Sequence, residues 1–200
     1  MSIFSIKFNS PKEILKSAVK FFILLQLIAL AYFIFRPITL GTPVVKVWGQ
    51  VAGWLFLITL LPGIITRFKI KNWISKVGQT IFFARTQLGI SMFLAAFLHY
   101  ILKVKSLIAV GNYPPKEIEL YFVFGMPALI LSLILAITSN QQSKKFLKKN
   151  WFRIHKLTYV ILLLVFAHVA VLERGLFIFT FAAMFTLEVV SYAAPRFKKN

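Results

Sequence analysis

The sequence contains no cysteine and no aspartate, and its five acidic residues are all glutamates. The absence of cysteine excludes disulfides, thiolate catalysis and iron–sulfur clusters. Polar residues are also scarce: 59% of the 200 residues are hydrophobic and the mean hydropathy is +0.81, values that exclude an ordinary soluble domain. At about 20 residues per membrane span, this length allows five or six spans and leaves no room for a soluble catalytic domain.

Continuous apolar segments predict an all-α, polytopic transmembrane six-helix bundle that forms a single domain over residues 1–200. Because these segments do not alternate between polar and apolar residues, a β-barrel is excluded. Pro62-Gly63 indicates a kink or an early end in the second span. The polar segment 138–150 predicts a loop. The spans are expected at about residues 21–40, 48–66, 80–102, 118–139, 152–172 and 176–194.

The 24 Lys and Arg residues give a net charge of +19 and are unevenly distributed among the connections. Eighteen of them lie at the two termini and in the second-to-third and fourth-to-fifth connections, including the span ends next to them. Since cytoplasmic loops carry the excess of Lys and Arg, both termini are expected in the cytoplasm. The same positions favour anionic lipid over nucleic acid as the partner of these charges.

The three histidines all lie in or at the third and fifth spans, which run in the same direction. His99 and His168 both lie near the outer ends of these spans and are expected at one level. Arg85 and His155 lie near the inner ends, about 20 Å away at 1.5 Å per residue. His155 and His168 share a helix face only if the helix is distorted or if His155 lies in its entry turn.

Two level imidazoles on facing helices inside an apolar bundle are the ligands that a b-type haem needs. The alternative interpretation is that each histidine is an interhelical hydrogen-bonding or interface residue. A zinc site is disfavoured, because no Cys, Asp or second-turn His supplements these residues. We favour the haem interpretation for the pair.

The chain resembles the ferric reductase-like transmembrane domain family. Within that family it looks most like the MsrQ (YedZ) group, the haem-binding subunits of periplasmic methionine sulfoxide reductase systems. Other relatives usually carry two histidines on each of two helices, whereas Arg85 takes the inner place on the third span here, as in the MsrQ group. The resemblance extends over about Val51 to Arg174 and rests on Arg85-x-x-Leu88-Gly89, His99-Tyr100, Thr138-Ser139, Trp151-x-x-x-His155-x-x-x-Tyr159 and His168.

The resemblance implies site residues. His99 and His168 would be axial ligands of the iron of an outer-leaflet haem b. His155 would lie on the inner side, as a ligand to the iron of a second haem or near FMN or a quinone. Arg85 would hold a propionate or phosphate through its guanidinium; it is equally well interpreted as a snorkelling, positive-inside residue.

The resemblance also implies a membrane b-type cytochrome of the bacterial inner (plasma) membrane, an electron-transfer subunit rather than a self-contained enzyme. Its donor would be a cytoplasmic flavin reductase or a quinone. Its acceptor would be a periplasmic molybdenum-containing methionine sulfoxide reductase. Two alternatives stay open: a related ferric- or oxygen-reducing cytochrome with another acceptor, and a cofactor-free proton-coupled transporter.

Glu188 is the one acidic residue that the sequence places well inside a span, away from its ends. A carboxyl group at membrane depth is protonated, paired or part of a proton path. We expect Arg85 or the inner site as its partner, and an interhelical hydrogen bond of the neutral acid is the alternative. No catalytic residue is predicted.

Overall fold

The computed structural model describes residues 10–35, 42–111, 119–172 and 175–197, and within them it contains helices and no strand. Six candidate spans are long and apolar enough to cross a membrane, with α6 and α7 together forming the fifth. The prediction of an all-helical, multi-pass membrane protein is therefore confirmed. The helices are α1 (Pro11–Phe35), α2 (Thr42–Arg67), α3 (Trp73–Ala109), α4 (Leu120–Thr138), α5 (Gln141–Leu147), α6 (Lys149–His155), α7 (Leu157–Leu172) and α8 (Leu176–Phe197).

Two helices extend further than the apolar pattern predicted. The proposed early end at Pro62 is wrong, because α2 continues to Arg67 and the hydroxyl of Thr66 donates to the carbonyl oxygen of Pro62 at 2.7 Å. α3 has 37 residues, about 55 Å of helix against a hydrocarbon core about 30 Å thick. Apolar length therefore predicted the membrane-spanning part of α3 and not its polar ends.

The polar segment 138–150 is largely helical, which corrects the predicted loop. The side chain of Asn140 accepts a hydrogen bond from the backbone N–H of Ser143 at 2.7 Å and caps the start of α5. Lys148, with a φ of 47°, separates α5 from α6. A second interruption follows, because α6 ends at His155 and α7 begins at Leu157. His155 therefore lies in a separate entry turn, one of the two conditions anticipated for it.

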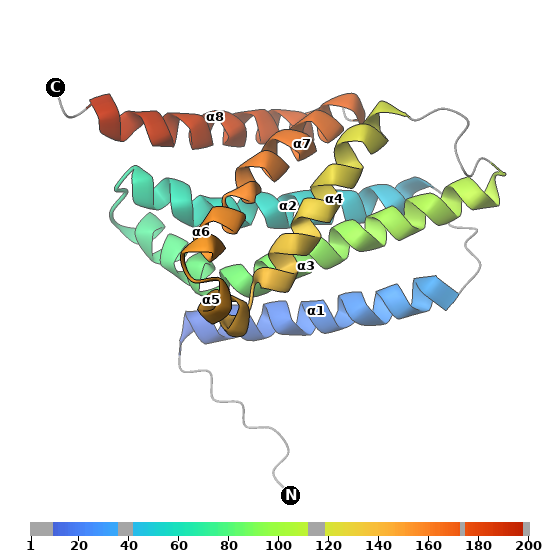
Figure 1. Cartoon of the computed structure of the whole chain (residues 1–200), viewed down its shortest axis with the longest axis horizontal. Coiled ribbons are helices and arrows are strands. Elements are labelled where there is room, and N and C mark those ends of the chain that lie inside the picture. Colours follow the sequence, from blue (N-terminus) through green and yellow to red (C-terminus); the bar gives the residue numbers. More distant parts are fainter. Residues whose placement is uncertain (1–9, 36–41, 112–118, 173–174, 198–200) are drawn as a thin grey trace, which may run out of the picture.

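The helices pack most extensively in three pairs: α2 with α3, α1 with α3, and α4 with α7. α1, α2, α3 and α8 run along the long axis of the molecule, while α4 and α7 cross it obliquely (Figure 1). The main core lies among α2, α3, α4, α7 and α8 and includes Phe56, Met92, Leu135, Ile161 and Phe181.

A buried polar pair fastens α1 to α3. Gln26 is 1% exposed and its amide nitrogen donates to the carbonyl oxygen of Ser91 at 3.1 Å. The hydroxyl of Ser91 donates back to the amide oxygen of Gln26 at 2.9 Å. Since an unpaired amide is unfavourable in an apolar interior, this reciprocal pair fixes the register of α1 against α3.

We expect the Gln26→Ala and Ser91→Ala substitutions to be coupled by about 0.6 kcal/mol, up to about 1.7 kcal/mol, the range of hydrogen bonds between membrane helices. Unfolding in detergent of both single variants and the double variant measures this coupling. Ser132 provides the control, because its hydroxyl donates within its own helix to Leu129. The effects of Gln26→Ala and Ser132→Ala on the free energy of unfolding should be additive. A similar coupling between Gln26 and Ser132, or no coupling between Gln26 and Ser91, would contradict the hydrogen-bonded pair.

Candidate functional site

His99 of α3 and His168 of α7 meet across a cavity in the bundle. Their ring centroids are 6.3 Å apart and the ring planes are perpendicular, at 89°. Both rings line the cavity, which has a volume of about 370 Å³, within the range of sites for small molecules and cofactors. The structure thus brings together the two histidines that the sequence placed at one level.

Each imidazole forms a hydrogen bond with a helix backbone through its Nδ1 atom. Nδ1 of His99 lies 2.7 Å from the carbonyl oxygen of Val45 in α2. Nδ1 of His168 lies 2.8 Å from the carbonyl oxygen of Tyr121 in α4. A carbonyl only accepts, so Nδ1 carries the proton in both rings and Nε2 keeps its lone pair. This second bond fixes the tautomer and orientation that a metal-binding histidine requires.

A glycine makes room for each ring. Gly49 and Gly125 each lie four residues after the residue whose carbonyl accepts the imidazole hydrogen bond. A Cβ at Gly49 would lie 2.9 Å from Nδ1 of His99, and a Cβ at Gly125 would lie 2.9 Å from Nδ1 of His168. Side chains at either position would displace the imidazole. The same local arrangement therefore occurs twice, once between α2 and α3 and once between α4 and α7.

The cavity is apolar at one end and basic at the other. Its inner part is lined by Phe56, Met92 and Ile161, among others. Lys46 and Lys103 lie towards the end where α2 begins and α3 finishes, and they are the only Lys, Arg, Asp or Glu residues among the described lining residues. The cavity thus suits a largely apolar ligand with a negatively charged edge.

The separation of the two rings fits a metal held between them. If each Nε2 lies about 2 Å from the metal and each ring centroid about 1.1 Å further away, the centroids are about 6 Å apart. Among the described residues, no group of three or more His, Cys, Asp or Glu side chains is placed to hold a metal ion. The two neutral imidazoles are the same kind of ligand that a bis-histidine haem centre uses.

His155 lies apart from this pair, at the other end of the bundle. Its ring stacks on Trp151, with centroids 3.9 Å apart, and its Nε2 is 3.3 Å from the hydroxyl of Thr138. The indole nitrogen of Trp151 donates to the carbonyl oxygen of Thr138 at 2.9 Å. Thr138 and Trp151, which both belong to the motif on which the resemblance rests, thus hold the ring. Arg85 is exposed and close enough for its charge to act on His155.

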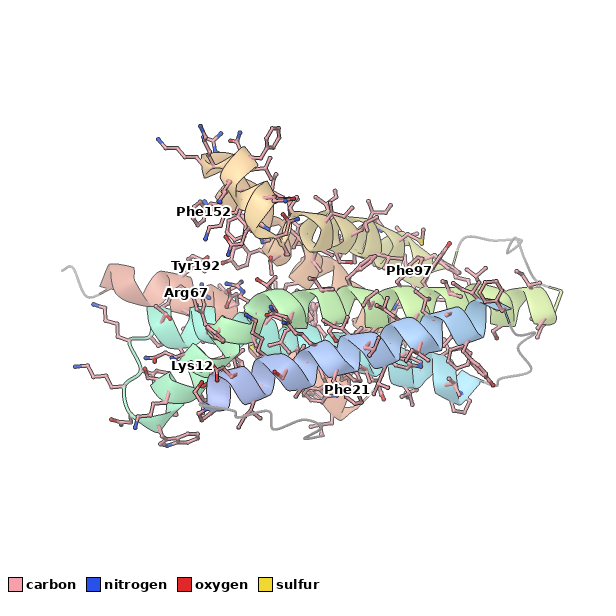
Figure 2. All side chains as sticks on the ribbon, turned by 90° about the horizontal axis from the view of Figure 1, so that it is seen from below. Lys12, Phe21, Arg67, Phe97, Phe152 and Tyr192 are labelled. Atoms are coloured by element: carbon pink, nitrogen blue, oxygen red, sulfur yellow. The ribbon has the colours of Figure 1, made fainter. Side chains whose placement is uncertain are left out.

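Glu188 is buried, at 5% exposure, and its partner is Arg67 rather than the expected Arg85. The carboxylate lies 2.5 Å from a terminal guanidinium nitrogen of Arg67. Nε of Arg67 donates to the hydroxyl of Ser191 at 2.7 Å, and the guanidinium lies 4.2 Å from the ring centroid of Tyr192. Tyr192 also hydrogen-bonds to the hydroxyl of Tyr159. Arg67 and Tyr192 adjoin each other in Figure 2, towards the end that carries Lys12.

Sequence reasoning missed the residues that hold the histidines. The carbonyls of Val45 and Tyr121 leave no signal in the sequence, since every residue has one. Gly49 and Gly125 are a weak signal, because glycine is frequent in membrane helices for other reasons. Arg67 was counted among the loop residues, because the second span was expected to end at about residue 66.

Residues 48–166 match the model of a protein family described as the ferric reductase like transmembrane component. The chain belongs to this family. The match covers more than half of the chain, from within α2 to within α7, and confirms the resemblance at the level of the ferric reductase-like family. His99 and His155 lie inside the matched region, and His168 follows two residues after its end. The protein is accordingly a multi-pass membrane protein of an electron-transfer family.

We expect Gly49→Ala and Gly125→Ala each to destabilise the protein by about 1–3 kcal/mol, because the new methyl group overpacks against an imidazole. Gly89→Ala is the matched control. Gly89 lies within α3 and a Cβ there would have no neighbour within 4 Å, so alanine should be neutral or stabilise the helix by about 0.5–1 kcal/mol. Unfolding in detergent measures the stability of all three variants. An equal loss of stability in Gly89→Ala would contradict the role assigned to Gly49 and Gly125.

Arg67→Met or Glu188→Leu alone is expected to destabilise the protein by about 3 kcal/mol, because each leaves the other charge of a buried pair without its partner. The free energy of unfolding of the double variant should fall by less than the sum of the two single effects, because neither buried charge then remains. Lys12→Met, at an exposed cation, should change the unfolding free energy by less than about 0.5 kcal/mol. Additive losses would show that the two side chains act independently.

Proposed function

We propose that the protein is a membrane b-type cytochrome in which His99 and His168 would hold the iron of a haem b. The observation that carries this proposal is the pair of imidazoles with centroids 6.3 Å apart across an apolar cavity, each held through Nδ1 by a helix carbonyl. Membership in the ferric reductase-like family supports it independently. Bound there, haem b supplies a one-electron redox couple.

The residues around the cavity then have definite tasks. The bonds to Val45 and Tyr121 keep both rings in the Nδ1–H tautomer, so that Nε2 is available as a ligand, and they prevent the rings from rotating. Phe56, Met92 and Ile161 exclude water from the inner part of the cavity. Burial in an apolar medium and neutral ligands together tune the reduction potential of such a centre.

The direction of electron transfer follows from the distribution of basic residues. We propose that both termini are cytoplasmic, because the start of α1, the connection between α2 and α3 and the end of α8, where Lys and Arg residues are concentrated, lie on one side of the bundle (Figure 1). In that orientation the His99–His168 pair lies in the outer half of the membrane. Electrons entering near His155 and Arg85 would leave outward.

The donor in this proposal is a cytoplasmic flavin reductase or a quinone, and FMN or a second haem near His155 would link it to the outer site. The acceptor is a periplasmic molybdenum-containing methionine sulfoxide reductase in the bacterial inner membrane system of the MsrQ group. The motif from Arg85 to Tyr159 supports this assignment. The family match supports equally a related cytochrome that reduces ferric iron or oxygen.

The reduced-minus-oxidised absorbance spectrum of the purified protein tests the haem proposal. We expect a bis-histidine b-type spectrum that is lost from the outer site in the variant carrying both His99→Ala and His168→Ala. His155→Ala, which removes a histidine outside the cavity, should retain the outer haem. Haem-free wild-type protein, or full haem content in the double variant, would refute the proposal. Reoxidation of the reduced protein by the reductase with methionine sulfoxide, rather than by a ferric chelate or oxygen, would identify the acceptor.

A further inference from the structure

The charges at the outer end of the cavity determine how a haem would be oriented there. Haem carries two propionates along one edge and apolar substituents along the opposite edge. Of the described residues that line the cavity, only Lys46 and Lys103 carry a full charge at neutral pH. The inner end offers Phe56, Met92 and Ile161 and no cation. A carboxylate directed inward would therefore be buried without a partner, which is strongly unfavourable.

Both lysines are fixed to the elements that hold the histidines. Lys103 lies one turn beyond His99 on α3, about 6 Å further along the helix axis. Its ammonium group lies 5.0 Å from the ring centroid of Tyr121, whose carbonyl holds His168. Lys46 directly follows Val45, whose carbonyl holds His99. The two lysines thus lie on α2 and α3, the helices that line the same end of the cavity.

We infer that Lys46 and Lys103 form a propionate-binding site, which orients the haem with its charged edge towards the outer end of the bundle and its apolar edge towards the core. The inference rests on the proposed function and adds the orientation of the cofactor. A lysine ammonium is a compact charge with three donors, suited to a carboxylate that approaches from the cavity. With the propionate edge outward, the edge nearest to an external acceptor is also the polar one.

Lys105 provides a matched control on the same helix. It lies two residues beyond Lys103, but its ammonium group donates to the carbonyl oxygens of Phe33 and Ile34, at 2.5 and 2.7 Å, at the end of α1. It is not among the residues that line the cavity. Its substitution removes a positive charge from the same end of the bundle without altering the cavity wall.

The test compares the binding of haem with that of haem dimethyl ester, whose propionates are uncharged, to the haem-depleted full-length protein in detergent. Wild-type protein should prefer haem by roughly 10- to 100-fold, the contribution of one or two charge-assisted hydrogen bonds. Lys46→Gln combined with Lys103→Gln should bind both porphyrins equally, with the ester affinity of the wild type. Lys105→Gln should retain the preference. Rising ionic strength should weaken the wild-type preference.

Ester binding by the double glutamine variant shows that it is folded, and its bis-histidine spectrum shows that the iron ligands are intact. A preference for haem that persists in this variant, or that disappears equally with Lys105→Gln, would overturn the propionate assignment and leave the haem proposal standing. Wild-type protein that binds neither porphyrin would instead overturn the proposed function, and the inference with it.

Discussion

The hydrogen bond from an imidazole Nδ1 to a helix carbonyl, made twice, is the interaction on which the site depends. It requires a close approach of ring and backbone, and Gly49 and Gly125 provide that approach. The two bonds join α2 to α3 and α4 to α7, which are also two of the most extensively packed helix pairs. The contacts between α3 and α4 are fewer. Each half of the site is thus formed within a tightly packed helix pair, and the cavity lies where the two pairs face each other.

Charged side chains lie at both ends of the bundle, and their surroundings differ between the two ends. At one end Arg67 gathers Glu188, Ser191 and Tyr192 and fastens α8 to α2. At the other end Lys46 and Lys103 face a cavity. In the first group the charges of Arg67 and Glu188 are paired with each other, as in a structural ion pair. The second group lines an open volume, which a ligand with a negatively charged edge would complement.

Several features of this arrangement were predictable from the sequence because they depend on composition or on helix geometry. The six spans follow from apolar length, and the meeting of His99 with His168 follows from their equal depth on parallel helices. Features that depend on tertiary contacts were not predictable. Glu188 was expected to pair with Arg85 or the inner site, but α2 extends beyond Pro62 and brings Arg67 to α8. The helical segment α5 was missed because it lacks an apolar run, although its Asn140 cap was visible in the sequence.

The uninterrupted course of α3 has a mechanical consequence. One helix of 37 residues carries Arg85, His99 and Lys103. The distances between these residues along this wall are therefore set by the rise of the helix. On the opposite wall the helix is divided at Lys156 into α6 and α7, and His155 is the last residue of the short α6. The inner histidine is therefore positioned by the packing of a short helix, whereas the outer histidine on α3 is positioned by a helix that runs through the whole bundle.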